Sequence, residues 1–255
     1  MESFQDQGIV LSVRAHGENG GIVSLMTEEH GRCAGYVRGA RGTKMRGTLE
    51  LANIVDANWS SRVEDGLGTY QLELSKSYAA VFMQDPLKLG ALQSACALVE
   101  NALPEREVHA GIYHGLAALF DVLQSDIWGE AYVMWEIAFL KELGFSLDLT
   151  TCAAGGEGPL IYVSPKTGRA VSKAAGMPYK GKLLPLPSFL SGAQGVASAV
   201  EDVYDGLKMT GYFLEHWVFN HHSRGVPDAR LLFAERFAKT IDKPITTELS
   251  EHVSG

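Results

Sequence analysis

The spacing of apolar residues changes near Asp85-Pro86 from alternation, with a period of two, to a period of about 3.6. No other feature limits the possible folds as strongly, because alternation suits strands and the longer period suits amphipathic helices. Asp85 is a good N-cap and Pro86 a good first helical residue, so the dipeptide itself marks a helix start. We therefore predict two domains, an all-β domain over residues 1–80 and an all-α helical domain over residues 81–255.

The first domain reads as five short strands separated by turn-forming residues. In the first strand we expect one buried face, formed by Ile9, Leu11 and Val13. Five short strands within residues 1–80 favour a small closed barrel, and the oligonucleotide/oligosaccharide-binding (OB) fold is the leading candidate. The expected strands cover residues 8–15, 22–26, 32–37, 49–59 and 69–75.

The second domain reads as a helical bundle with an irregular insertion. Glycine and proline are frequent between about residues 148 and 187, where only two short β-like pieces, 160–164 and 169–172, interrupt the loops. The expected helices begin at Pro86, at Pro104-Glu105 and at Gly129, and two more cover residues 199–222 and 228–239. The residues expected to face the core are Leu92, Cys96, Val99 and Leu103 in the first helix and Leu116, Leu119, Phe120 and Leu123 in the second.

The formal net charge of −8 argues against binding of nucleic acid by the chain as a whole. Two stretches depart from this average because each holds five cations and no carboxylate. The first runs from His30 to Leu49 and the second from Gly158 to Val200. A charge run is most often a solvated face, so the spacing within each stretch decides its interpretation.

The first cationic stretch has a spacing that suits nucleic-acid binding. Strand alternation places Arg32, Tyr36 and Arg38 on one face, where guanidinium groups would contact phosphates and the tyrosine ring would stack on a base. The loop that follows carries Arg41, Lys44 and Arg46, is expected to be flexible, and could close over a bound strand, while Arg14 would extend the track. The alternative is that Arg32 and Arg38 are solvated or pair with Glu28, Glu29 and Glu50, and that Tyr36 simply packs.

Motifs of the common enzyme classes do not occur in the sequence. The segment from Gly39 to Lys44 lacks the spacing of a Walker phosphate loop, and there is neither a Gly-x-Ser-x-Gly elbow nor a His-Glu-x-x-His pair. Cys33, Cys96 and Cys152 form no Cys-x-x-Cys pair, which indicates reduced thiols. We expect a protein without catalytic residues and without a cofactor.

Several segments, taken in order, resemble the bacterial DNA repair protein RecO family. They include GIVLSVRAHGENGGIVSLMTEEHGR and YVRGARGTK in the first domain and WEIAFLKELGFSLDLTTCAAGG, YVSPKTGRAVS, LLPLPSFL and GVPDARLLF in the second. The resemblance spans nearly the whole chain. It implies an N-terminal OB-fold, a helical domain with a small zinc-finger-like insertion, and no enzymatic turnover.

The same resemblance implies a recombination mediator. Members of the family bind single- and double-stranded DNA, anneal complementary strands and, with RecR, help RecA replace single-strand-binding protein (SSB). By position, Arg14, Arg38, Arg41 and Lys44 match basic positions of the family's DNA-contacting barrel. This agrees with the interpretation of the spacing.

The insertion departs from the zinc-bearing members of that family, which have two Cys-x-x-Cys pairs. Cys152 matches the first of these cysteines, but Gly155 stands at its partner's position, and Ser172 and Ala175 occupy the approximate place of the second pair. A tetrahedral zinc site needs four such ligands. We therefore expect a metal-free insertion.

The second cationic stretch suggests a site for the acidic, apolar-tipped tail of SSB, which members of the family capture on the helical domain. Trp135 and Phe139, four residues apart on one helix face, would contribute an apolar groove. The charge would come from Lys166, Arg169, Lys173, Lys180 and Lys182. The alternatives are that Trp135 and Phe139 belong to the bundle core and that the cations add affinity for DNA.

A function of another class also stays open, namely a protein-interaction module whose barrel docks a protein partner and whose cations only solubilise it. The N-terminus lacks the basic-then-apolar pattern of a secretory signal, and no run reaches the roughly 18 apolar residues of a spanning helix. We therefore expect a cytoplasmic, nucleoid-associated protein with no membrane partner.

Overall fold

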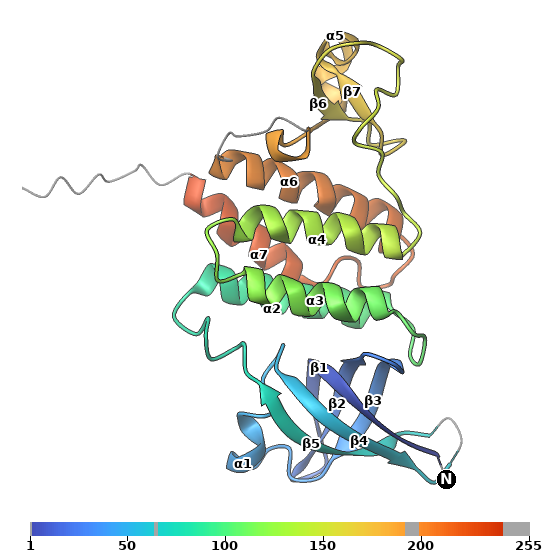
Figure 1. Ribbon diagram of the computed structural model, residues 1–255, viewed down its shortest axis with the longest axis vertical. Helices are drawn as coiled ribbons and strands as arrows, with labels where there is room; N and C mark the ends of the chain where they lie inside the picture. The colour runs from blue at the N-terminus through green and yellow to red at the C-terminus, as the bar shows by residue number, and fades with distance from the viewer. Residues whose placement is uncertain (1, 64–65, 192–198, 242–255) are drawn as a thin grey trace, which may run out of the picture.

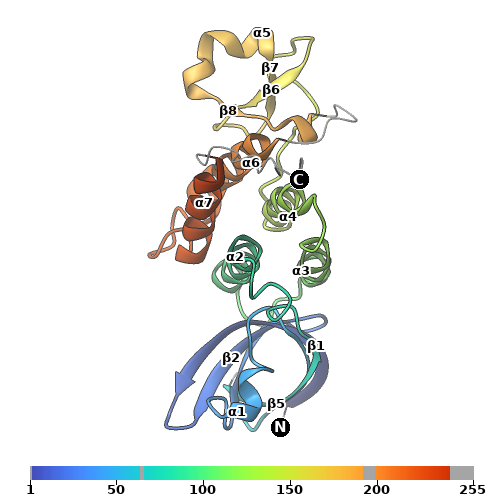
Figure 2. The same cartoon turned by 90° about the vertical axis from the view of Figure 1, so that its left-hand side faces the viewer.

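A computed structural model describes residues 2–63, 66–191 and 199–241 of the chain. A β-barrel lies at one end of an elongated molecule, helices form its middle, and a small sheet unit lies at the other end (Figures 1 and 2). The predicted order, a β-rich N-terminal domain followed by a helical region, is confirmed.

The barrel is closed, with the strand order β1-β2-β3-β5-β4. Neighbouring strands are antiparallel except β3 and β5, which meet in a short parallel pair and complete the closure. The C-terminal half of β1 pairs with β2 and its N-terminal half with β4. The interior holds, among others, Val10, Leu25, Trp59 and Tyr70. The strands are β1 (Glu2–His16), β2 (Gly20–Thr27), β3 (Gly31–Val37), β4 (Ile54–Ser61) and β5 (Gly68–Lys76).

The first strand is longer than predicted, and its predicted buried face is confirmed for Ile9 and Leu11 but wrong for Val13. Val10 points into the barrel, Ile9 and Leu11 belong to the core shared with the helices, and Val13 is exposed. The strand is covered on both sides at this point, and a register shift between Val10 and Ser12 breaks the alternation. An alternating pattern of buried and exposed residues is therefore lost where one strand contributes side chains to two cores.

The helices begin and end close to their predicted positions, with two exceptions. The second helix starts at Ala110 rather than at Pro104, because Glu105 forms a bridge with Arg32 and the backbone N–H of Arg106 donates to the Arg32 carbonyl over 2.8 Å. The long helix expected to reach residue 222 ends at Phe213 and continues as one π-helical turn to Val218. The helices are α2 (Pro86–Ala102), α3 (Ala110–Val122), α4 (Trp128–Glu142), α6 (Val200–Phe213) and α7 (Asp228–Ile241), with a short α1 (Thr43–Arg46) in the barrel.

The eight residues expected to face the helical core are all buried. Asp85 caps α2 as predicted, its side chain accepting from the backbone N–H groups of Leu87 and Lys88. In the part of the chain that the structure covers, no helix is both long and apolar enough to cross a membrane.

The insertion contains the two predicted β pieces in a small three-stranded sheet. Its strands are β6 (Leu160–Val163), β7 (Ala170–Ser172) and β8 (Leu184–Pro185), and between β7 and β8 lie α5 (Lys173–Gly176) and a 3-10 helix, η1 (Met177–Lys182). We call residues 148–187 the distal unit, because the helices separate it from the barrel (Figures 1 and 2).

Barrel and helices share one hydrophobic core. Ile9 and Met26 of the barrel belong to the same buried cluster as Leu92 and Val99 of α2. Polar contacts close the junction around it, and in one of them the Arg32 Nε donates to the Leu103 carbonyl over 2.9 Å. The junction therefore fixes the orientation of the barrel against the helices.

Candidate nucleic-acid interface

The outer surface of the barrel carries a row of side chains that crosses three strands. Arg14 on β1 pairs with Ile22 on β2, and Ile22 pairs with Tyr36 on β3. Directly opposed residues of neighbouring strands point to the same face of a sheet. The alternation predicted for β3 is confirmed, since Arg32, Ala34 and Tyr36 are partly exposed while the residues between them are buried.

Tyr36 lies over a glycine that gives it room. A Cβ placed on Gly20 would come within 2.5 Å of the Tyr36 ring, so only glycine allows the ring to lie against the backbone of β2. The edge of His16 meets the ring at a centroid distance of 6.0 Å and an interplanar angle of 77°. Tyr36 is thus held on the barrel surface, on the same sheet face as Arg14, instead of packing into the barrel core.

The basic loop after β3 is anchored rather than flexible, which corrects the expectation from its glycine content. Ala40 and Leu49 are buried in the barrel core, and Met45 of α1 packs against the same core. Gly39 adopts φ +71°, which lets the chain turn sharply so that Ala40 reaches Gly21. The backbone N–H and one guanidinium nitrogen of Arg41 donate to the carbonyls of Asn19 and Glu18.

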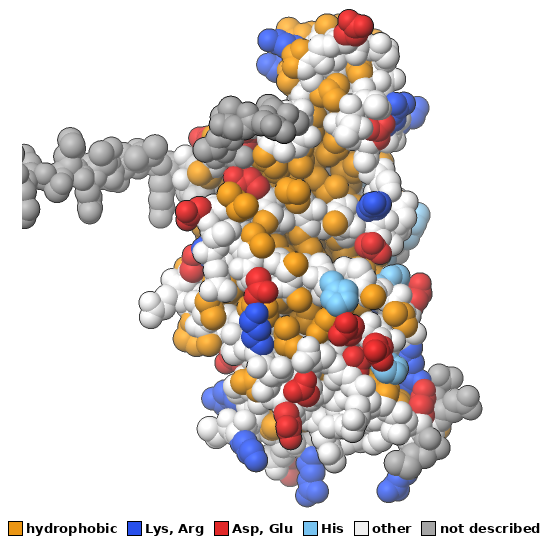
Figure 3. All heavy atoms as spheres, in the orientation of Figure 1, with side chains coloured by type: hydrophobic (Ala, Val, Ile, Leu, Met, Phe, Trp, Pro, Cys, Tyr) orange, Lys and Arg blue, Asp and Glu red, His pale blue; other side chains and the backbone are white. Residues whose placement is uncertain are grey.

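Between these apolar anchors the cations of the loop point to solvent. Arg38, Arg41, Lys44 and Arg46 are all exposed, as is Arg14. Within the described ranges none of the five forms an ion pair with a carboxylate, so the pairing with Glu50 that the sequence left open for Arg38 does not occur. Figure 3 shows several lysine and arginine side chains along the lower rim of the barrel, away from the helices.

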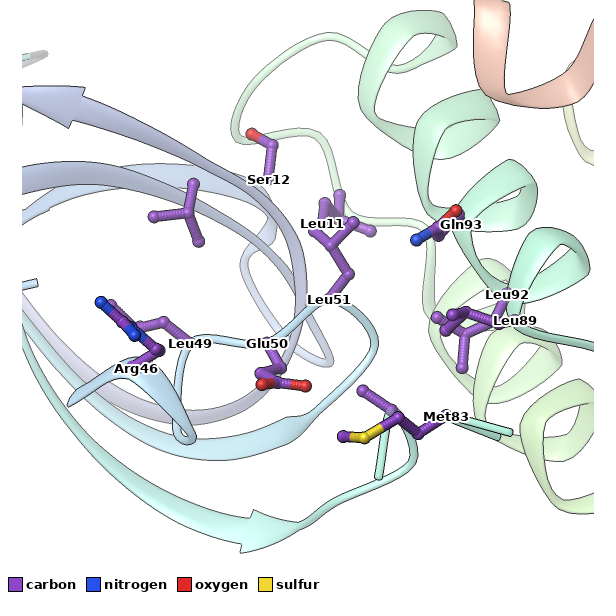
Figure 4. Close-up of a pocket in the computed structure, with 12 residues that line it drawn as sticks. Leu11, Ser12, Arg46, Leu49, Glu50, Leu51, Met83, Leu89, Leu92 and Gln93 are labelled. Carbon is purple, nitrogen blue, oxygen red and sulfur yellow. The ribbon is translucent and has the colours of Figure 1, made fainter. Parts of the chain in front are cut away.

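Two of the predicted contacts lie apart from this rim. Arg32 is at the junction, where its guanidinium is 3.4 Å from Glu105 and 3.7 Å from Glu100, so it pairs with carboxylates of the helical region rather than with Glu28 or Glu29. Arg46 lines the groove between the barrel and α2, close to Glu50 and across from Met83 (Figure 4). The structure therefore brings together Arg14, Tyr36, Arg38, Arg41 and Lys44, and it places Arg32 and Arg46 elsewhere.

The row on the barrel continues over residues that the sequence analysis missed. Tyr36 pairs with Thr69 on β5, and Thr69 pairs with Ser60 on β4. These residues border a shallow groove of uncharged polar side chains that includes Asn58 and Gln71. The sequence carries no local signal for this continuation, because it depends on the long-range pairing of β3 with β5.

Comparison with known proteins gives the same family for both parts of the chain. Residues 1–78 match the family model described as recombination protein O N terminal, and residues 83–224 match the one described as recombination protein O C terminal. The chain belongs to the RecO family. Proteins named DNA repair protein RecO are similar over most of their length: that of Rhodospirillum centenum is 49% identical over 92% of this chain and 95% of the relative. The corresponding protein of Rhodospirillum rubrum is 45% identical over 94% of this chain and 98% of the relative. That of Caulobacter vibrioides is 45% identical over 92% of this chain and 98% of the relative.

The distal unit does not provide the ligands of the zinc site found in zinc-bearing RecO proteins. A Cβ on Gly156 would lie 3.9 Å from the Cys152 Sγ, 3.1 Å from the Ser172 Oγ and 3.9 Å from the Ala175 Cβ, whereas Gly155 has no neighbour within 4 Å. Gly156 rather than Gly155 thus completes this cluster, which contains one thiol. Among the described residues no group of three or more His, Cys, Asp or Glu side chains could hold a metal ion. The residues present do not fit zinc.

The Cys152 side chain instead accepts hydrogen bonds from the backbone. The N–H of Ser172 donates to Sγ over 3.3 Å. Together with the Ser172 hydroxyl and the N–H groups of Ala154 and Gly156, it lowers the pKa of Cys152 from 9.0 to about 7. Hydrogen bonds to the charged form favour ionisation. These contacts tie the loop before β6 to the end of β7 through backbone N–H groups, without a metal.

The aromatic pair proposed for the SSB tail lies in the bundle core. Trp135 is 7% exposed and Phe139 2% exposed, and their rings stack at a centroid distance of 5.4 Å. The bundle-core alternative therefore holds for both residues. Lys166, Arg169 and Lys173 lie in the distal unit, and Arg169 pairs there with Asp148, its Nε 3.3 Å from the carboxylate. The structure does not bring these five residues into one groove.

Proposed function

We propose that this protein is a DNA repair and recombination mediator that binds DNA on the rim of its barrel. The observation that carries the proposal is the Arg14–Ile22–Tyr36 row with the anchored basic loop beside it, which places unpaired cations next to an aromatic ring on one surface. Cations contact phosphates and the ring stacks on an unpaired base, which together suit single-stranded DNA. Double-stranded DNA would be held through phosphates alone.

The proposed activity is annealing without catalytic turnover. Holding strands on a basic surface lowers their mutual repulsion and raises their local concentration, so no covalent step is required. Membership of the RecO family supports the wider role, in which the protein acts with RecR to promote the loading of RecA on SSB-coated DNA. An OB fold with this binding role fits the closed five-stranded barrel.

The alternative function, a barrel that docks a protein partner, finds its best support in the groove between the barrel and α2. Leu11, Leu51, Met83 and Leu89 give that groove an apolar floor (Figure 4).

The test is the salt dependence of binding to a labelled single-stranded oligonucleotide, followed by fluorescence anisotropy. The four cations of the rim in contact with phosphates predict a slope of log K against log salt of about −2.8, at about −0.7 per phosphate. In Arg38→Ala/Arg41→Ala/Lys44→Ala we expect weaker binding and a slope shallower by about 2.

The matched control is Arg236→Ala/Lys141→Ala/Lys239→Ala, which removes the same charge at exposed positions on the helices, away from the barrel. Its binding to the rim should stay near that of the wild type. Absence of binding by the wild-type protein at low salt would reject the DNA proposal and favour the protein-docking alternative.

A further inference from the structure

The distal unit is basic although the chain as a whole is acidic. Residues 148–187 contain five lysine or arginine residues and two carboxylates, a net charge of +3 against −8 for the whole chain. One of the two carboxylates, Asp148, is paired with Arg169. In Figure 3 the uppermost part of the molecule shows lysine or arginine side chains at both of its sides.

The outermost segment of this unit exposes an aromatic ring among lysines. The 3-10 helix η1 has no buried residue, and it presents Tyr179 at 61% exposure and Met177 at 57%. Lys180 and Lys182 follow Tyr179 in sequence, and Lys173 lies on the preceding α5; all three are exposed. In the part of the chain that the structure describes, none of these lysines forms an ion pair.

The unit is built so that this segment stays outside. Ser172 caps α5 by accepting from the N–H of Ala175, and Gly176 is buried against the ring of Tyr162 on β6. Leu183 also packs close to Gly176. Because side chains three residues apart eclipse each other in a 3-10 helix, Tyr179 and Lys182 share one face of η1. Packing explains the position of Gly176, but it gives no role to Tyr179.

We propose that the distal unit carries a second binding surface for single-stranded nucleic acid, formed by Tyr179, Lys173, Lys180 and Lys182. An exposed ring that stacks on a base and lysines that contact phosphates are the two elements of such a surface. An acidic peptide would use the lysines and leave the ring without a role, so the observations favour an unpaired strand. The barrel rim and this surface lie at opposite ends of the molecule, with the helices between them (Figures 1 and 2).

Two surfaces at opposite ends give one chain the means to hold two strands at once. This consequence rests on the proposed function, because it requires the barrel rim to bind DNA as well. A second strand held on the same molecule has a raised effective concentration relative to the first. The distal surface would thus bring a partner strand to the strand on the barrel.

The test counts short oligothymidylates bound per chain at low salt. A length of about 8 nucleotides fills one small site and is too short to run from one end of the molecule to the other. The count is made by titration calorimetry and analytical ultracentrifugation, which also reports the oligomeric state. The variants are Tyr179→Ala/Lys180→Ala/Lys182→Ala for the distal surface, Arg38→Ala/Arg41→Ala/Lys44→Ala for the rim, and both sets together.

We expect two oligonucleotides per wild-type chain, one for each triple variant and none for the combined variant. Tyr179→Ala alone should weaken the distal site by about 5-fold or more, whereas Tyr179→Phe, which keeps the ring, should restore it. Lys141→Ala/Lys239→Ala serves as the charge control and should keep two sites. The substituted distal residues are exposed, and circular dichroism checks that each variant is folded.

The outcomes separate this inference from the proposed function. One site that is lost only in the rim variant overturns the distal surface and leaves the proposed function standing. One site that is lost only in the distal variant supports the distal surface and rejects the rim. Loss of oligoglutamate binding in the distal variant, with the oligothymidylate count unchanged, would identify an acidic peptide as the ligand and overturn the inference.

Discussion

Arg230 and Glu136 form a buried ion pair that joins three helices. The Arg230 Nε is 2.5 Å from one Glu136 oxygen, and another guanidinium nitrogen is 2.9 Å from the second. The same guanidinium donates to the Leu207 carbonyl of α6 over 2.8 Å, and the Thr210 hydroxyl donates to Glu136. Glu136 is fully buried and Arg230 is 2% exposed, so each charge depends on the other for compensation.

Replacing Arg230 by alanine is expected to destabilise the protein strongly. The free energy of unfolding, measured by urea denaturation, should fall by about 3–5 kcal/mol, because Glu136 would be left charged and buried. Arg236→Ala, an exposed position on the same helix, is the control and should change it by less than about 0.5 kcal/mol. Equal effects of the two substitutions would show that the pair does not stabilise the bundle.

Cys152 is expected to react faster than the other thiols at neutral pH. Backbone N–H groups lower its pKa to about 7, while burial raises the pKa of Cys33 and raises that of Cys96 to about 12. The rate of alkylation by iodoacetamide, followed by mass spectrometry in Cys33→Ala/Cys96→Ala, should rise with a midpoint near pH 7. A midpoint near 9 would contradict the hydrogen-bonded thiolate.

The same ionisation links stability to pH with a definite sign. The folded pKa lies below the unfolded value of 9.0, so the thiolate stabilises the folded state fully above pH 9. This contribution decreases as the pH falls from 9 to 7, and it is absent below the folded pKa. Cys152→Ser should remove this part of the pH dependence.

At the scale of elements, sequence patterns predicted what local interactions decide. The Asp85 cap, the buried stripe of α2 and the end of α4 at Gly144, which adopts φ +88°, were predictable because each depends on neighbours in the chain. The alternation of β3 was predictable for the same reason. Within the candidate site, that alternation predicted the exposed face of Tyr36, and the run of cations predicted the basic loop.

Other elements depend on contacts that no local pattern reveals. The register shift in β1 lies where Ile9 and Leu11 pack in one core with α2, and the late start of α3 follows from the pairing of Glu105 and Arg106 with Arg32. Arg32 therefore lies at the junction and not on the predicted DNA-binding surface. Trp135 and Phe139 show the converse, since their helix face is apolar on the sequence but α3 covers it.

The whole molecule joins two predicted domains through one core. Ile9 and Leu11 of the barrel and Leu92 and Val99 of α2 are buried in the same cluster. Around it the Ser12 hydroxyl donates to Glu100 over 3.0 Å, and Lys76 pairs with Asp121 over 2.6 Å. The change in the spacing of apolar residues near Asp85 thus marks a change from strands to helices. It does not mark a boundary between two separate hydrophobic cores.

The shared core predicts that barrel and helices unfold together. In hydrogen exchange at increasing urea, the slowest amides of β2 and of α2 should converge on one unfolding free energy, because neither element keeps its core when the other unfolds. The amides of η1, which has no buried residue, serve as the internal comparison and should exchange at a lower free energy. Two separate free energies for β2 and α2 would mean that the barrel unfolds on its own, and the rim would then be independent of the helices. A single value means instead that a strand bound on the rim stabilises the helices by the same amount, through the linkage between binding and unfolding.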